Sequence, residues 1–279
     1  MKNQLKIKLS LCLIVCAIHL NAQETLTQIL SDNKVEMPYI SPWPTKVDGV
    51  NKPVLSLNGE WKVSVQGAQP ISVTVPGELT MQGIDLAIGE TAVYSTQIQI
   101  PSDWKGKRVF LRFDAVSSYA SVKVNGQKVG EHEGSFVPFQ MEITKALSQG
   151  NNILEVAVRA NTISDVLACT SQYAVHTVAG ILRKVSLIAL PETHIQDITV
   201  NTSFDNNYQN AQLDISAMVN GNNTPNDYTI SYALKDMDGK KVAANAVMAS
   251  LASNKKTASA NISIPVRKVK SWNPEWPYL

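Results

Sequence analysis

The chain has 279 residues, of which 44% are hydrophobic and 17% charged, and its formal net charge is +2. This length suffices for one large domain or two ordinary domains. The near balance of charge, with no cluster of lysine and arginine beyond the first residues, argues against a partner that is nucleic acid or an anionic membrane.

The first 22 residues have the pattern of a secretory signal peptide. Lys2, Lys6 and Lys8 form a positive start, an apolar run covers residues 9–20, and we expect cleavage after Ala22. As a helix, this run covers roughly 18 Å of a hydrocarbon core about 30 Å thick, so we do not expect it to span a membrane. Loss of the three lysines would change the net charge from +2 to about −1. We therefore expect a periplasmic or secreted protein.

Cysteine usage agrees with export from a bacterial cell. Cys12 and Cys16 leave with the signal peptide, so that Cys169 alone remains and no internal disulfide can form. Export without disulfides fits a bacterial periplasm or exterior. Residues 23–36, which follow the cleavage site, are polar and carry no clear signal.

Residues 37–191 read as one all-β domain. Helical periodicity is nearly absent, and short alternating runs separated by turn residues are typical of antiparallel sandwiches. Asn125-Gly126 predicts a tight hairpin, because a type I′ turn needs positive φ at both central residues. The predicted strands are Glu60–Val65, Ile71–Val75, Val93–Ile100, Arg108–Phe113, Ala120–Val124, Lys128–Glu131, Ile153–Arg159 and Leu182–Leu190.

A second all-β domain is expected over residues 192–279, after Pro191. Asp238-Gly239 is another good hairpin turn. Five to six strands in roughly 85 residues indicate an immunoglobulin-like sandwich, which usually has about seven, so we expect an incomplete one. The predicted strands are His194–Thr202, Ala211–Val219, Tyr228–Leu234, Lys241–Met248 and Thr257–Ile264.

The last residues look like the lead-in to a further strand. Pro274 and Pro277 favour an extended backbone before Tyr278 and Leu279, which are strand formers. We therefore expect the sequence to be the front part of a longer protein.

A series of motifs resembles glycoside hydrolase family 2, which contains β-galactosidases, β-glucuronidases and β-mannosidases. The motifs occur in family order over residues 36–279. The resemblance implies a jelly-roll-like, galactose-binding-like β-sandwich followed by an immunoglobulin-like sandwich. The motifs are Leu57–Val63, Val75–Glu78, Tyr94 with Ile100–Val109, Val122–Gly130, Glu131–Phe139, Gly150–Asn152, Gly180–Val185 and Trp272–Leu279.

The resemblance also implies which parts this sequence lacks. In the family, two catalytic glutamates lie on a (β/α)₈ barrel that follows the second domain, and retaining hydrolysis needs two such carboxyl groups about 5–5.5 Å apart. No residue here matches them, so we expect no catalysis by this chain alone, and no cofactor or metal. The expected partners are a catalytic barrel, missing or separately encoded, and carbohydrate. A free-standing carbohydrate-binding module and a non-functional remnant stay open as alternatives.

Two residues are candidates for contact with substrate. His176 lies in the loop Ser164–Ala179, which in β-galactosidases of the family carries an aspartate that reaches the substrate; the matching position here holds Ala174. His176 can either touch substrate or pack in a domain interface. Trp104 follows Pro101 in a turn and is the best exposed candidate for stacking on a sugar, with interface packing as the alternative.

Other conspicuous side chains point to structure. Glu131 and Glu133 share one face of a strand, as a glycosidase pair could, but they adjoin the Asn-Gly turn, and we expect a solvated hairpin arm. His132 points to the other face, which disfavours a metal site. Trp61 lies in an alternating strand and is expected in the core.

Overall fold

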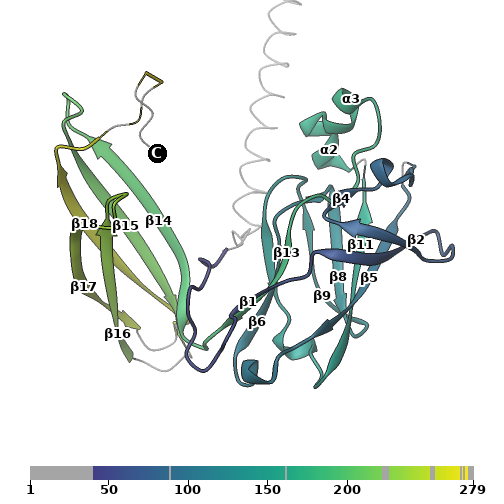
Figure 1. Cartoon of the computed structure of the whole chain (residues 1–279), viewed down its shortest axis with the longest axis horizontal. Coiled ribbons are helices and arrows are strands. Elements are labelled where there is room, and N and C mark those ends of the chain that lie inside the picture. Colours follow the sequence, from purple (N-terminus) through teal and green to yellow (C-terminus); the bar gives the residue numbers. More distant parts are fainter. Residues whose placement is uncertain are drawn as a thin grey trace, which may run out of the picture. The chain divides into compact units, whose positions relative to one another are not determined.

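The computed structural model describes residues 40–275, apart from 88, 161, 222–225, 252–254, 271 and 273. The predicted signal peptide, the segment 23–36 and the predicted strand entry at Tyr278–Leu279 lie outside these residues. The described part is all-β, as predicted, with two sets of antiparallel sheets and only short helices (Figure 1).

The first sandwich contains a four-stranded and a six-stranded sheet, with a small third sheet at one end. The four-stranded sheet has the order β1 (Val54–Ser56), β13 (Val185–Leu190), β6 (Arg108–Phe113) and β10 (Phe139–Glu142). The six-stranded sheet has the order β3 (Ile71–Val75), β2 (Gly59–Val65), β5 (Ala92–Gln99), β11 (Asn151–Arg159), β8 (Tyr119–Val124) and β9 (Gln127–Glu133). The small sheet joins β4 (Gly77–Glu78), β12 (Gly180–Ile181) and β7 (Val116–Ser117).

Short helical segments connect these strands. They are the 3₁₀ turns η1 (Thr80–Gln82), η2 (Ser102–Trp104) and η3 (Thr144–Ala146), and the α-helices α2 (Ile163–Ala168) and α3 (Thr170–Ala174). The two α-helices correct the prediction of a plain loop over Ser164–Ala179. The predicted strand Leu182–Leu190 begins only at Val185, and β1, β4, β7 and β10 were not predicted.

Alternating apolar residues build the core between the two larger sheets. Trp61 is buried as predicted, and its indole N–H donates to the carbonyl of Leu57 at 2.8 Å. The rings of Trp61 and Tyr94 meet edge to face at 6.4 Å, an arrangement that adds to the gain from burial. Phe113 and Phe139, which lie opposite each other on β6 and β10, stack with their ring centroids 5.0 Å apart.

The predicted Asn-Gly hairpin is confirmed. Asn125 and Gly126 have φ of 51° and 78° and connect β8 to β9. The side-chain oxygen of Asn125 also accepts the N–H of Ile153 at 2.9 Å, so the turn is fixed to the neighbouring strand β11.

The second sandwich has a three-stranded and a two-stranded sheet within the described residues. The sheets are β14 (His194–Phe204), β15 (Asn210–Asn220) and β18 (Thr257–Arg267), and β16 (Asn226–Lys235) with β17 (Lys241–Leu251).

One strand of this sandwich has a partly covered apolar face. Ile198 and Val200 of β14 pair with Ala217 and Ile215 of β15, so the four side chains share one face of the sheet. Ala217 is buried, but 41% of Ile198 and 55% of Val200 are exposed. Among the described residues, this end of the inner face is therefore only partly covered.

Candidate functional site

The segment between β11 and β12 carries α2 and α3 at one end of the first sandwich (Figure 1). The hydroxyl of Thr162, just before α2, lies 2.8 Å from that of Ser118 at the sandwich edge. Asp165 is buried, and its carboxylate accepts the N–H of Ser171 at 3.3 Å, so it joins the two helices. One side of the helical segment is therefore fixed to the sandwich by polar groups.

The end of this segment is tied down by hydrogen bonds before it enters β12. Ser117 donates to the carbonyl of Val178 at 2.7 Å, and the N–H of Val178 reaches the hydroxyl of Ser171 at 3.0 Å. Two further bonds are made by the N–H of Leu79 to the carbonyl of Ala179 at 2.9 Å, and by the hydroxyl of Thr80 to the carbonyl of Thr177 at 3.2 Å.

Gly180 lies so close to the neighbouring backbone that a residue with a side chain would not fit there. Its φ is +133°, and a Cβ atom here would lie 2.7 Å from the carbonyl oxygen of Gly77 and 3.1 Å from the hydroxyl of Tyr94. Burial raises the pKa of Tyr94, so the phenol stays neutral under the loop. Position 180 therefore sets the distance between the loop and the strand that bears Glu78.

His176 lies against a carboxylate at this end of the sandwich. Its Nε2 lies 2.5 Å from the Glu78 carboxylate, and its Nδ1 lies 2.9 Å from the carbonyl oxygen of Ala174. The carbonyl oxygen and an ionised carboxylate can only accept hydrogen bonds. The imidazole can therefore donate to both partners only when each of its nitrogens carries a proton. The Glu78 carboxylate, then the Ala174 carbonyl, raise the pKa of His176, and Asp85 adds a smaller attraction. The site thus presents a partly exposed histidine–carboxylate pair.

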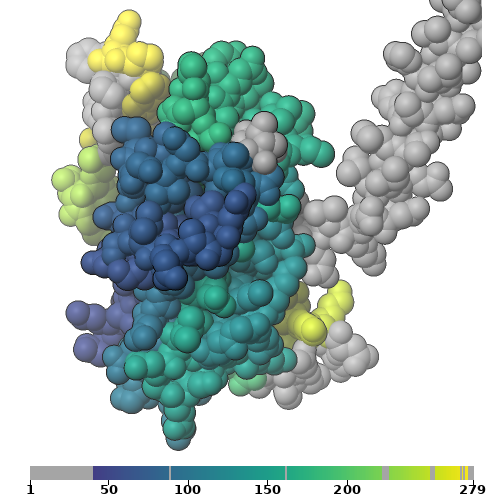
Figure 2. Space-filling view, turned by 90° about the vertical axis from the view of Figure 1, so that its right-hand side faces the viewer, coloured from purple at the N-terminus to yellow at the C-terminus, as the bar shows by residue number. Residues whose placement is uncertain are grey.

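The helical segment that precedes His176 also carries exposed apolar side chains, and Figure 2 shows this segment at the top of the first sandwich. These side chains are between 68% and 90% exposed. Clusters of this kind commonly mark interaction sites. The residues of this apolar loop surface are Ile163, Val166, Leu167, Tyr173 and Val175.

Neither this surface nor the partner of His176 was predicted from the sequence. Ile163, Val166 and Leu167 have the spacing i, i+3, i+4 of a helix face, which was the available signal. Glu78 lies 98 positions from His176 and gives no local sign of the contact. Within the described residues His176 contacts its own sandwich, so its expected role at a substrate or an interface stays a prediction.

Trp104 corrects an expectation. We expected an exposed ring, but only 2% of the residue is exposed, because η2 turns it into the core, where its N–H donates to the carbonyl of Lys52 at 3.1 Å. A ring buried in this way has no free face for a sugar to stack on.

Glu131 and Glu133 lie on an exposed face of β9, as predicted for a solvated hairpin arm. A hydrogen bond from Lys128 is the main cause that lowers the pKa of Glu131. His132 points to the other face and stacks on Phe139 at 4.1 Å, where burial lowers its pKa.

The described residues hold no group of three side chains suited to a metal ion. In the same part of the chain, no helix has the length and apolar character needed to cross a bilayer.

Comparison with known proteins gives the family. The family model described as "Glycosyl hydrolases family 2, sugar binding domain" matches residues 51–191, and the one described as "Glycosyl hydrolases family 2" matches residues 193–279. The chain belongs to glycosyl hydrolase family 2. The site with His176 is therefore at one end of the family 2 sugar-binding domain.

Relatives of this family 2 chain are much longer. It is 29% identical to a β-galactosidase of Streptococcus thermophilus over 80% of this chain and 25% of that protein. It is 32% identical to a β-galactosidase of Priestia megaterium over 64% of this chain and 17% of that protein. The chain thus spans a quarter or less of these two relatives.

Solved structures agree with the fold. A β-glucuronidase of Bacteroides uniformis matches with a TM-score of 0.68 and 25% identity, over 80% of this chain and 29% of that one. A β-glucuronidase of Bifidobacterium dentium, complexed with coumarin-3-O-glucuronide, matches with a TM-score of 0.64 and 26% identity, over 84% of this chain and 44% of that one.

Proposed function

We propose that this chain is the non-catalytic, N-terminal part of an exported retaining exo-glycosidase of the β-galactosidase type, which acts on terminal β-linked sugars. Its first sandwich uses the apolar loop surface to dock on a catalytic barrel. The observation that carries the proposal is this surface, on the helical segment that leads to the pair of His176 and Glu78, at one end of a family 2 sugar-binding domain.

The exposed apolar side chains are the physical reason to expect a docking partner. Full burial of one Val, Leu or Ile side chain stabilises by roughly 1.5–3 kcal/mol, so the four such groups of this surface, together with Tyr173, can supply much of a stable interface. The partner we propose is the barrel that family 2 relatives encode after their sandwiches. Because the chain covers 25% of the Streptococcus β-galactosidase, most of that relative lies beyond the matched part.

The chemistry divides between the two parts. The barrel would supply one carboxyl group as acid and base and another as nucleophile, about 5–5.5 Å apart. The sandwich would supply His176, whose imidazolium can donate a hydrogen bond to a sugar hydroxyl or to a carbonyl of the barrel. Glu78 orients the imidazole and raises its pKa, which favours the protonated form.

Export forms part of the proposal. The basic start, the apolar run and Ala22 support cleavage by signal peptidase and delivery to the periplasm or the exterior. The mass of the protein recovered from the periplasm of an expression host tests this point, because cleavage after Ala22 fixes the new N-terminus.

The decisive experiment extends the native DNA beyond the codon for residue 279 and compares the two products. On nitrophenyl β-galactoside, β-glucuronide and β-mannoside, we expect no hydrolysis by the chain alone and hydrolysis by a product that includes a barrel. Val175→Asp should weaken activity of the extended product, whereas Ile71→Asp, at a half-exposed position on β3, should leave it unchanged.

A reading frame that ends without a barrel would contradict the proposal and favour a free-standing carbohydrate-binding module or a remnant. Equal effects of the two substitutions would contradict the docking role of the apolar loop surface.

A further inference from the structure

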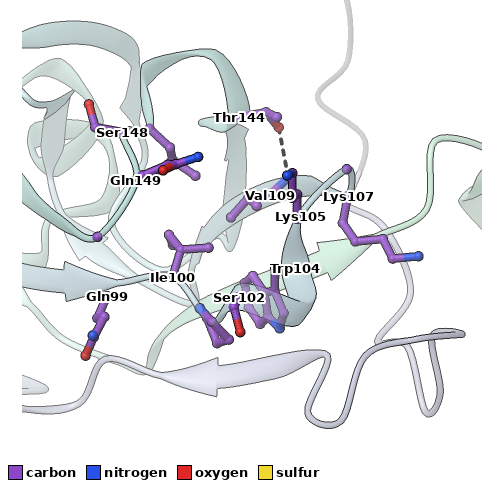
Figure 3. Close-up of a pocket in the computed structure, with 14 residues that line it drawn as sticks. Gln99, Ile100, Ser102, Trp104, Lys105, Lys107, Val109, Thr144, Ser148 and Gln149 are labelled. Carbon is purple, nitrogen blue, oxygen red and sulfur yellow. Dashed lines mark hydrogen bonds between the residues drawn. The ribbon is translucent and has the colours of Figure 1, made fainter.

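A cavity of about 750 Å³ lies between two connections of the first sandwich, the β5–β6 connection and the η3–β11 connection (Figure 3). Residues 99–107 form one wall and residues 144–150 the other. Its volume is in the range of about 300–1,000 Å³ that is usual for small-molecule sites.

This distal cavity is separate from the site at His176. Strands β5 and β11 pair antiparallel from Gln99 with Asn151 to Ala92 with Val158. The cavity includes Gln99 at one end of this ladder, and the α2–α3 segment follows the other end. At a rise of about 3.4 Å per residue, the two ends are roughly 23 Å apart.

The floor of the distal cavity is apolar and its rim is polar. The accessible apolar surface of the cavity comes from the half-buried side chains of Ile100 and Leu147, and the buried Trp104 and Val109 also border it. On the rim, exposed side-chain amides and hydroxyls make no hydrogen bond to other described residues. These rim residues are Gln99, Ser102, Ser148 and Gln149.

The charge at the rim is positive. The two charged residues that line the cavity are Lys105 and Lys107; the ammonium of Lys107 donates to a backbone carbonyl at 2.9 Å, and Lys105 has no side-chain partner among the described residues. Three carboxylates of neighbouring residues have other partners. Asp48, whose backbone carbonyl accepts the Lys107 ammonium, pairs with Lys46 at 3.4 Å. Asp103 accepts a backbone N–H at 2.8 Å, and Glu142 pairs with Arg108 at 2.6 Å.

We propose that the distal cavity binds a sugar unit that carries an acidic group. The apolar floor suits the C–H face of a pyranose ring, the uncommitted amides and hydroxyls suit its hydroxyl groups, and Lys105 suits a carboxylate or sulfate on the ring. Because neither the barrel nor His176 takes part, this proposal stands apart from the proposed glycosidase function.

The test uses the purified full chain and a matched pair of sugars, methyl β-galacturonide and methyl β-galactoside, which differ in the acidic group alone. Trp104 lies in the wall of the cavity, so tryptophan fluorescence can report binding, with calorimetry as an independent readout. We expect saturable binding of the galacturonide at least fivefold tighter than that of the galactoside, and weakening by salt because the charges are exposed. Sodium sulfate serves as the third probe.

Substitutions locate the site. Lys105→Ala should weaken binding of the galacturonide about tenfold, the usual effect of losing a hydrogen bond between charged groups. Ser148→Trp should abolish binding by filling the cavity, whereas Lys184→Ala, at an exposed lysine outside the cavity, should have no effect. Circular dichroism checks that each variant is folded.

Equal affinity for the two sugars would overturn the assignment of an acidic group. Sulfate binding as tight as that of the galacturonide would indicate an adventitious ion only and overturn the sugar site. Absence of binding, or binding that Ser148→Trp leaves intact, would overturn the proposal as a whole.

Discussion

Replacing Gly180 by alanine is expected to destabilise the first sandwich and to release the loop that carries His176. The added Cβ atom would lie 2.7 Å from the carbonyl oxygen of Gly77, on backbone that cannot rotate away. The φ of +133° is also far from the values that L-residues with a side chain prefer.

The two effects add to about 4 kcal/mol. A residue held in a sparsely populated backbone region costs roughly 1–3 kcal/mol, and the shift needed to relieve an overpacked contact costs a similar amount. Gly126 is the matched control, because its φ is +78° but a Cβ atom there meets nothing within 4 Å. Gly126→Ala should therefore cost only about 1–2 kcal/mol.

Urea unfolding followed by tryptophan fluorescence measures both variants, since Trp61 is buried in the first sandwich. Hydrogen exchange at Leu79, whose N–H bonds to Ala179, should rise in Gly180→Ala and stay unchanged in Gly126→Ala. If Gly180→Ala costs no more than Gly126→Ala, the close approach is not a constraint and the reasoning is refuted.

Two further predictions concern the histidine–carboxylate pair and the second sandwich. Glu78→Gln should lower the pKa of His176 toward its ordinary value, seen by NMR titration of the imidazole, and Glu131→Gln should leave it unchanged. Since the pKa of His176 is raised in the folded state, the pair contributes its full stability to the fold below the ordinary pKa of about 6.5. This contribution is lost as the pH rises through the folded pKa. A difference in unfolding free energy between wild type and Glu78→Gln that does not change with pH would contradict this. Residues 23–279 should associate in solution through the partly covered face of β14, whereas residues 23–192 should stay monomeric, as light scattering can measure. Val200→Ser should reduce the association, and equal monomeric behaviour of both lengths would refute the prediction.

Local patterns sufficed for much of the β-structure. Alternation predicted β2, β5 and β11 to within about two residues at each end, and Asn125-Gly126 predicted the hairpin because the turn chemistry is contained in two neighbouring residues. The shortest strands, such as β4 and β7, have no alternation to detect and depend on pairing with β12.

The candidate site residues could not be predicted in the same way. Local sequence marked Trp104 as a turn residue, but its burial depends on tertiary contacts such as the bond from its N–H to the carbonyl of Lys52. Likewise, the raised pKa of His176 depends on Glu78, which only the tertiary structure brings near. The resemblance to the family pointed to this loop, and a role of His176 at a substrate or an interface stays a prediction.

The pairing of β1 with β13 has a consequence for the order in which the protein folds. Val54 lies opposite Ile188, and the N–H of Val185 bonds to Asn58, 127 positions away. An inner strand of the four-stranded sheet is thus the last part of the first sandwich to be synthesised. Strand β6 therefore gains its second partner, β13, only late. Contacts this distant in sequence are typical of domains that fold in milliseconds to seconds. During synthesis, the apolar faces of the earlier strands stay uncovered until residues 185–190 have been made. Misassembly is therefore most favoured at this stage.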